Sequence, residues 1–369
     1  MPEKGAALAE PTTAQFAAAR DLLHKAIGQH AFPGAAWGVR HQGKVVALEA
    51  LGRFTYEPDA APVLPGTVFD LASVSKVVAT SAAAMLLADR GLFLLDARLG
   101  DILPGFVIGM EPGSGKERVT LRMLLAHTSG VVGYAPLFRT CTSPDALLRT
   151  ILQMPLESRP GEKTEYSDFG YILLGKVIEV LTGQPLDVFC SREIFAPLGL
   201  PATCFLPPET WKTAIPPTED DQTFRHRVIH GEVQDEHAFV LGGVAGHAGL
   251  FANVEDLLRF AQCILDEGRT AGGQTLFEPR TIEQFATRQG SGRALGWDVP
   301  TENSSSGRYF GPRSIGHLGY AGTSLWIDRD RQLAIALLTN RTWPDRQNEA
   351  IRQIRPPFHD AIVEALGVV

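Results

Sequence analysis

The hydrophobic residues of this chain follow a strand pattern near both ends and a helical pattern in between. Residues 34–40 and 44–51 are predicted to form two strands joined by a tight turn at 41–43. Near the C-terminus, residues 323–328 and 332–339 form a second predicted strand pair. Because a strand needs partners for its backbone groups, we expect both pairs to join in one antiparallel sheet.

The middle of the chain is predicted to be mainly helical. Candidate helices begin after a capping residue or end before a glycine, and they cover residues 73–89, 121–126, 168–181 and 254–265. A first helix is expected from near Thr12, with a capping box to Gln15, and a last helix over 358–366.

These elements predict an α+β fold, with an antiparallel sheet from both chain ends flanked by helices and an inserted, mainly helical lobe. We expect a single domain, 1–369. Its α/β lobe covers about 1–70 and 290–369, and its helical lobe covers about 71–289.

The charge and hydrophobicity of the chain argue against two classes of partner, nucleic acids and membranes. The 369 residues carry a net charge of -7 and no basic stripe, so we do not expect a nucleic-acid partner. The N-terminus lacks the apolar run of a secretory signal, and no apolar stretch approaches the roughly 18 residues of a membrane span. We therefore expect a cytoplasmic protein without a membrane partner; its oligomeric state is left open.

Ser73-Val74-Ser75-Lys76 is the S-x-x-K motif of the chain, and it lies where the strand-like segment 68–71 meets a predicted helix. A serine at a helix N-terminus lies beside free N–H groups, and positions three apart share one helix face. The Lys76 amine can therefore reach the Ser73 hydroxyl and activate it as a nucleophile. Taken alone, the motif fits a plain helix cap and a solvated lysine better.

Two further segments offer partners for this pair. Tyr166 comes just before the predicted helix 168–181 and is a candidate second proton carrier. His317 lies among small residues beside the predicted strand 323–328, where a substrate backbone has room to lie. His127 ends an apolar helix, and we interpret it as a structural residue bonded to neighbouring backbone.

Together, S-x-x-K after Leu-Ala, Tyr-Ser-Asp before a Gly-Tyr helix, and H-x-G before a strand resemble the β-lactamase-related serine hydrolases. That group contains class C β-lactamases, DD-peptidases and similar esterases. The segments 127–130 and 241–251 also resemble stretches common in the group. The resemblance spans about residues 15–366.

The resemblance implies roles for individual residues. Ser73 would form the acyl-enzyme, and Lys76 and Tyr166 would share the acid and base work in a division that stays open. The backbone N–H groups of Ser73 and Tyr320 would form the oxyanion hole. Substrate would be bound by Asp168, His317 and Gly319.

Two departures from the family pattern bear on the substrate. Asp168 stands where asparagine is common, and a carboxylate cannot donate the hydrogen bonds of an amide. His317 replaces the usual lysine, so its grip on a substrate carboxylate should weaken. We therefore favour a carboxylesterase acting on small-molecule esters. A DD-carboxypeptidase, penicillin-binding protein or weak β-lactamase acting on amides is the alternative, and a catalytically silent binding protein is the third reading.

Neither the cysteines nor the histidines have the spacing of a metal site. The four cysteines form no C-x-x-C pair, so we expect buried free thiols in a reducing compartment. No H-E-x-x-H pattern occurs, and we predict no metal and no other cofactor. Segment 235–237 is expected to lie in a loop lining the cleft. The residues concerned are Cys141, Cys190, Cys204, Cys263, His226, His230, Asp235, Glu236, His237 and His247.

Overall fold

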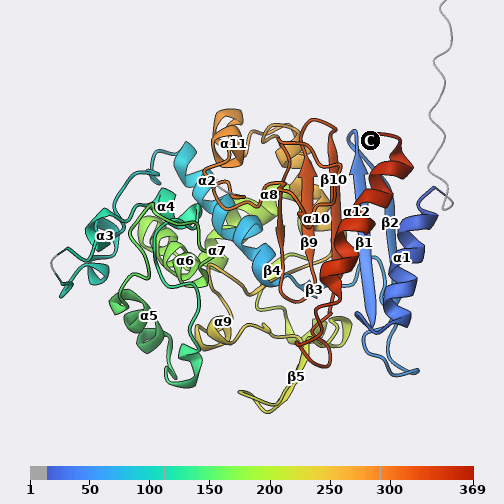
Figure 1. Cartoon of the computed structure of the whole chain (residues 1–369), viewed down its shortest axis with the longest axis horizontal. Coiled ribbons are helices and arrows are strands. Elements are labelled where there is room, and N and C mark those ends of the chain that lie inside the picture. Colours follow the sequence, from blue (N-terminus) through green and yellow to red (C-terminus); the bar gives the residue numbers. More distant parts are fainter. Residues whose placement is uncertain (1–14, 112, 291) are drawn as a thin grey trace, which may run out of the picture.

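A five-stranded antiparallel sheet forms the backbone of the fold, in a computed structural model that describes residues 15–111, 113–290 and 292–369. The strand order is β2-β1-β10-β9-β8, so the N-terminal hairpin pairs directly with the C-terminal strands (Figure 1). This confirms the predicted sheet from both chain ends. The strands are β1 (Gly34–His41), β2 (Lys44–Gly52), β8 (Ile315–Leu318), β9 (Ser324–Asp328) and β10 (Leu333–Thr339).

Helices cover both faces of this sheet. On one face, α1 (Ala17–Gly28) and α12 (Ile351–Leu366) pack together, and Trp37 of β1 lies edge-on to Phe358 of α12. On the other face, α10 (Val254–Leu265) contacts β1 and β10. Successive side chains of a strand point to opposite faces, and a strand buried on both sides is therefore mainly apolar, as β10 is up to its last residue, Thr339.

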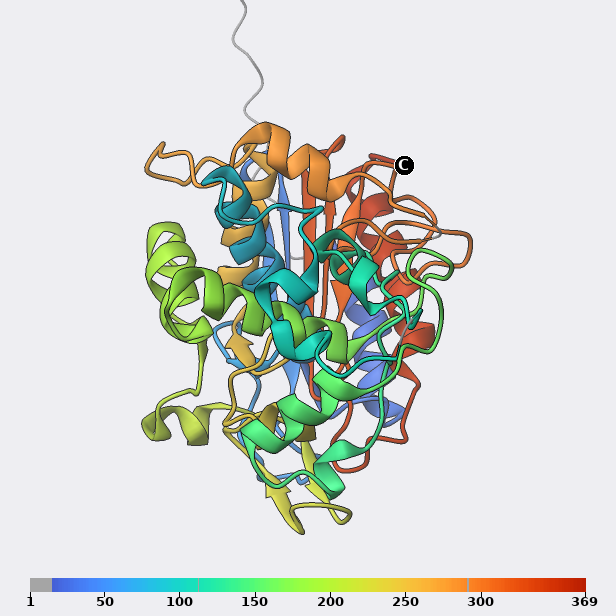
Figure 2. The same cartoon turned by 90° about the vertical axis from the view of Figure 1, so that its left-hand side faces the viewer.

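The remaining helices form a mainly helical region beside α10. In Figure 2 this region lies in front of the sheet. Two small sheets lie outside the main sheet: one has the order β3-β7-β4, with β3 leading directly to the segment of Ser73, and the other pairs β5 with β6. The elements are α2 (Ala82–Asp89), α3 (Leu99–Ile102), α4 (Leu121–Leu125), α5 (Pro144–Gln153), α6 (Asp168–Thr182), α7 (Leu186–Cys190), α8 (Ala196–Leu198), α9 (Glu236–Val240), α11 (Pro279–Ala286), β3 (Phe69–Asp70), β4 (Cys204–Phe205), β5 (Glu219–Asp221), β6 (Arg227–Ile229) and β7 (Leu250–Ala252).

One continuous helical run, Ala72–Asp89, forms the centre of the helical region. It is long and apolar enough to cross a membrane by length and composition alone, which corrects the expectation that no stretch approaches that length. Within the protein 83% of the run is buried, as in the core helix of a globular domain. Its second turn widens into a π-helix, Lys76–Ser81, a distortion that is frequent at functional sites.

The predicted helix ends are confirmed where capping residues mark them. Ser167 caps α6 by accepting from the Gly170 N–H, and α6 ends at Gly183 with φ 67°. The last helix begins earlier than the predicted range 358–366. Helix α12 begins at Ile351 and runs through Pro356 and Pro357, which lie before the predicted start. Burial of its apolar face against the sheet outweighs the two lost backbone bonds. The expected cap at Thr12 lies outside the described residues.

The cysteines are free thiols, as expected, and all but the half-buried Cys204 are buried.

Candidate active site

A strained turn presents Ser73 at the start of the long helical run. Strand β3 ends at Asp70, and Ala72 adopts a left-handed backbone conformation with φ 46°. The fully buried Asp70 carboxylate stabilises this turn, because it accepts from the N–H of Ala72 at 2.8 Å and from that of Gln234 at 2.7 Å. Burial raises the pKa of Asp70 to about 6. The first turn of a helical run leaves N–H groups without a helical partner, and here they lie beside the Ser73 hydroxyl.

Lys76 is fully buried, and its ammonium has three acceptors. Nζ lies 2.9 Å from Ser73 Oγ, 2.7 Å from Asp168 Oδ1 and 3.0 Å from the carbonyl oxygen of His247. The expected contact between Lys76 and Ser73 is therefore present. Asp168, expected to meet substrate, forms an ion pair with Lys76 in the structure.

Tyr166 completes the predicted group around the nucleophile. Its hydroxyl hydrogen-bonds the Ser73 side chain, and Lys76 Nζ lies 4.9 Å from the centre of its ring. Burial, together with the negative charge of Asp168, raises the pKa of Tyr166 well above its usual range, while the bond to Ser73 acts in the opposite direction. The phenol is therefore neutral in the free protein.

His127 holds Tyr166 in place, as a structural residue. Its ring stacks on that of Tyr166 at 4.6 Å, and its Nδ1 accepts from the backbone N–H of Ser167 at 3.0 Å. This confirms the prediction that His127 bonds neighbouring backbone. Burial lowers the pKa of His127 well below its usual range, which keeps Nδ1 free to accept.

The edge strand β8 brings His317 into the cavity that Ser73 and Tyr166 also line, and Gly319 follows it along the chain. Nδ1 of His317 bonds the Leu318 carbonyl at 2.8 Å, and burial, with Lys76 and Arg293 nearby, lowers its pKa well below its usual range. His317 is therefore uncharged. A Cβ on Gly319 would lie 1.9 Å from Thr323 Oγ1, so only glycine fits this close approach to the start of β9.

The N–H of Tyr320 makes no hydrogen bond within the described parts of the chain, which suits an oxyanion-hole donor. Two arginines bind the carbonyl groups of the same turn. Arg341 Nε donates to the Tyr320 carbonyl at 2.7 Å, and Arg355 Nη2 donates to the Gly319 carbonyl at 3.1 Å and to that of Thr323 at 2.9 Å. These bonds fix the turn so that the Tyr320 N–H stays available.

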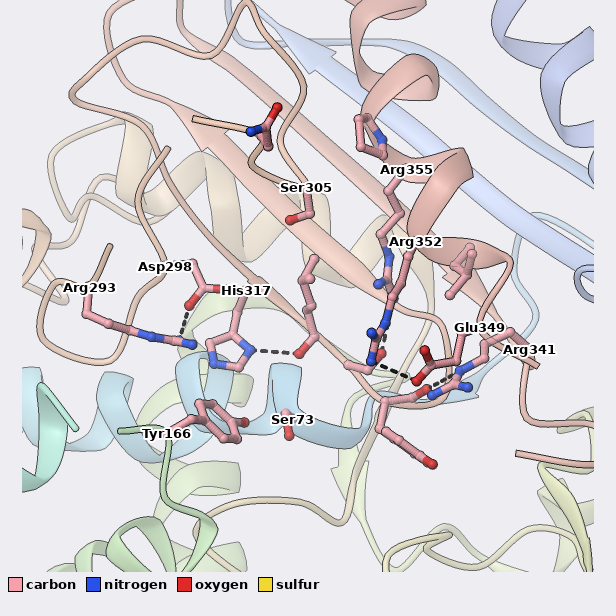
Figure 3. Close-up of a pocket in the computed structure, with 16 residues that line it drawn as sticks. Ser73, Tyr166, Arg293, Asp298, Ser305, His317, Arg341, Glu349, Arg352 and Arg355 are labelled. Atoms are coloured by element: carbon pink, nitrogen blue, oxygen red, sulfur yellow. Dashed lines mark hydrogen bonds and ion pairs between the residues drawn. The ribbon is translucent and has the colours of Figure 1, made fainter. Parts of the chain in front are cut away.

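Sequence reasoning missed the arginines of the cleft. Four of them line a cavity of about 480 Å³ together with Ser73, Tyr166 and His317 (Figure 3). Two are paired with carboxylates of the same cavity and two bind backbone carbonyls, so the lining has more positive than negative groups. The pairs are Arg293 with Asp298 and Arg352 with Glu349, and the carbonyl-bound arginines are Arg341 and Arg355.

The histidines weighed as metal ligands have other partners. Nε2 of His247 lies 2.7 Å from Asp235 Oδ1. This contact holds in place the residue whose backbone carbonyl accepts a hydrogen bond from Lys76. The ring of His237 lies among those of Tyr134, Phe138 and Phe169. Within the described residues, no three His, Cys, Asp or Glu side chains group in a way that would hold a metal ion.

Comparison with known proteins agrees with this geometry. The sequence model of the family described as Beta-lactamase matches residues 16–355. A protein named "Putative D-alanyl-D-alanine carboxypeptidase" from Escherichia coli (strain K12) is 35% identical over 339 residues, covering 83% of this chain and 74% of that protein. The "N-acetylmuramyl-L-alanine amidase" of Bacillus subtilis (strain 168) is 33% identical over 345 residues, covering 84% of this chain and 77% of that protein.

Solved structures share the fold at lower sequence identity. EstCE1, a hydrolase with promiscuous acyltransferase activity, has a TM-score of 0.74 at 21% identity, covering 95% of this chain and 98% of that chain. A class C β-lactamase from Rhodobacter sphaeroides has a TM-score of 0.72 at 22% identity, covering 95% and 99%. With the family match over most of its length and the serine, lysine and tyrosine brought together, this chain belongs to the β-lactamase family of serine hydrolases.

Proposed function

We propose that this chain is an amidase or peptidase of the DD-carboxypeptidase kind, which forms an acyl-enzyme on Ser73 and prefers substrates carrying a carboxylate near the scissile bond. The substrate class rests on the charge of the cleft. The names of the relatives at 33–35% identity support an amide rather than an ester as the bond cleaved.

The chemistry follows from the contacts around Ser73. Its hydroxyl oxygen attacks the substrate carbonyl, and the developing oxyanion accepts hydrogen bonds from the backbone N–H groups of Ser73 and Tyr320. Lys76 and Tyr166, both hydrogen-bonded to the Ser73 oxygen, take its proton and return it to the leaving group. A water molecule then releases the acyl group by the same route.

The excess of arginine in the cleft is the observation that carries the substrate preference. Arg352 is exposed at the cavity wall, and the guanidinium of Arg293 lies over Tyr166 with its carbon atom 5.0 Å from the ring centre. A cleft with an excess of one sign of charge concentrates ligands of the opposite sign. These arginines supply the attraction for an anion that a neutral His317 lacks.

A carboxylesterase, the activity favoured from the sequence, is the second candidate. The neutral His317 favours it, because the position where relatives often carry a lysine has no charge here. Both candidates use the same acyl-enzyme and differ in the leaving group and in the need for a carboxylate.

Three substrates separate the two candidates: N-acetyl-D-alanyl-D-alanine, its C-terminal amide, and p-nitrophenyl acetate. We expect kcat/KM to be at least about tenfold higher for the free acid than for its amide, since complementary charge accelerates and strengthens binding. Equal values for acid and amide, with faster turnover of the ester, would establish the carboxylesterase instead.

Ser73→Ala serves as the control in every assay and should abolish turnover. If a fluorophosphonate probe failed to label Ser73 in the native protein, the chain would be a binding protein on a hydrolase scaffold.

A further inference from the structure

Lys76 is paired with a carboxylate, and this pairing distinguishes the site from one with an amide at position 168. The motif here reads Tyr166-Ser167-Asp168, whereas asparagine is common at the last place in the family that the chain resembles. An amide oxygen accepts a hydrogen bond from an ammonium but has no net charge. A carboxylate at 2.7 Å adds a full ionic attraction inside a largely buried site.

The local structure places this carboxylate where a negative charge is well accommodated. Asp168 is the first residue of the 15-residue helix α6, whose N-terminus carries partial positive charge. Its side chain is 21% exposed, while that of Lys76 is fully buried. Lys76 Nζ, with three acceptors at 3.0 Å or less, has a partner for each of the three hydrogens of an ammonium.

The same negative charge also acts on Tyr166. Loss of the phenol proton would place a second anion beside Asp168, and the interaction with Asp168 keeps that proton on the oxygen. Because Lys76 donates to three acceptors and Tyr166 keeps its proton, the group formed by Lys76, Tyr166 and Asp168 has to release one proton before it can accept that of Ser73.

We infer that Asp168 holds this proton on the Lys76–Tyr166 pair, so that acylation of Ser73 requires a higher pH than it would with an amide at position 168. The inference rests on the proposed acyl-enzyme function and applies whichever of the two residues is the base. Because the three groups are coupled, a single apparent titration of the whole group should govern the rate.

The bond changes are the ordinary ones of acyl transfer. The extra proton goes to bulk water, and the freed base takes the proton of Ser73 as its oxygen bonds to the substrate carbonyl carbon. The bond from that carbon to the leaving nitrogen or oxygen then breaks, and the leaving atom receives the proton.

Other charged and titratable groups around the pair act in both directions. Cationic Arg293 over Tyr166 favours release of the proton, as do the histidines if they become charged, whereas buried Asp298 opposes release. All of them stay in place when position 168 is changed, so a comparison at that position isolates one charge. The groups are Arg293, Asp298, His127, His317, His237, His247 and Tyr171.

The test compares pH profiles of kcat/KM on p-nitrophenyl acetate for the native protein, Asp168→Asn and Asp168→Glu. Removal of an opposite charge at this distance should move the acidic limb of Asp168→Asn down by about one to three pH units, while Asp168→Glu keeps the native limb. The matched control is Asp145→Asn, because Asp145 is also an acid in the first turn of a serine-capped helix but is exposed and outside the cleft. It should leave the limb unchanged.

A second measurement needs no variant at position 168. The rate at which a fluorophosphonate labels Ser73 in the native protein should fall with a single titration as the pH drops below about 10, where an ammonium and a phenol both keep their protons. An Asp168→Asn limb at the native pH, or a labelling rate that stays constant down to about pH 5, would overturn the inference. Failure of the proposed function has a different signature, namely labelling of Ser73 without any preference for the free-acid peptide.

Discussion

The guanidinium of Arg341 lies over the ring of Tyr320, with its central carbon 4.3 Å from the ring centre, and its Nε binds the Tyr320 carbonyl at 2.7 Å. The carbonyl that Arg341 holds belongs to Tyr320, the residue whose N–H is the proposed oxyanion donor. An oxyanion hole works only when its donors are fixed before the reaction begins. Arg341 is therefore a positioning residue for the proposed oxyanion hole.

Arg341→Gln should lower kcat by about 10- to 100-fold on p-nitrophenyl acetate with a smaller change in KM, because a displaced donor is lost mainly in the transition state. Arg259→Gln is the control, since Arg259 also donates to a backbone carbonyl, that of Gly199, far from the cleft. Equal loss of kcat in both variants, or none in Arg341→Gln, would contradict this role. Circular dichroism of each variant checks that the fold is kept.

Gly319→Ala should disrupt the same turn by crowding. The new methyl group would lie 1.9 Å from Thr323 Oγ1 and 2.3 Å from the Leu71 carbonyl, and the second of these is fixed backbone. We expect a loss of about 1–3 kcal/mol in the free energy of unfolding, together with a fall in kcat, measured by urea titration and ester turnover. Gly28→Ala, where nothing lies within 4 Å, should change neither.

Arg352→Gln tests the contribution of the exposed cleft charge to binding. KM for N-acetyl-D-alanyl-D-alanine should rise several-fold, while KM for p-nitrophenyl acetate should stay constant, and the effect should shrink at high salt as screening increases. Arg308→Gln is a closely matched control: the side chains of Arg308 and Arg352 are both 68% exposed and paired with a glutamate. A parallel rise in KM for the neutral ester would show that shape, not charge, has changed.

Asp70 should make the stability of the protein depend on pH. Its pKa is raised from 3.8 to about 6 in the folded state, so the folded state binds more protons than the unfolded state between these values. The contribution of Asp70 to stability is then fully present below about pH 4 and is lost as pH rises through about 6. A pKa difference of this size corresponds to roughly 3 kcal/mol.

Urea unfolding of native protein and Asp70→Asn at several pH values between about 4 and 7 measures this contribution. The difference between the two free energies of unfolding should change across that range, because the amide does not titrate. Other buried acids contribute equally to both proteins and cancel. A constant difference would show that Asp70 keeps an ordinary pKa in the folded state.

Local sequence signals were sufficient for the main elements and for the contact between Ser73 and Lys76. In the hairpins of β1 with β2 and of β9 with β10, the apolar residues alternate with polar ones or follow one another, and both patterns are typical of strands. Helices α6 and α10 each have a capping residue that marks the start and apolar residues that recur along one face. Helices α5 and α11 were not predicted from the sequence. Both begin with proline, which is common at the first position of a helix, but both are short and lie between long loops.

Some contacts of the site follow from local sequence spacing, and others depend on how distant segments pack. Lys76 follows Ser73 by three residues, so helix geometry alone predicts their contact. The arginines of the cleft come from separate segments around 293, 341 and 352–355, and only the packed sheet and α12 bring them together. The pairing of Asp168 with Lys76 likewise depends on how α6 packs on the core helix, which no local pattern encodes.

The pairing of β1 with β10 has a consequence for the order of synthesis. A ribosome makes β1 and its hairpin first, whereas β10, the strand that lies between β1 and β9, emerges only after the whole helical region. Until then β1 has an open edge, and the turn bearing Tyr320 has no sheet to hold it beside Ser73. A nascent chain that lacks β10 therefore carries Ser73 without the proposed oxyanion hole, which can form only after β10 has paired with β1.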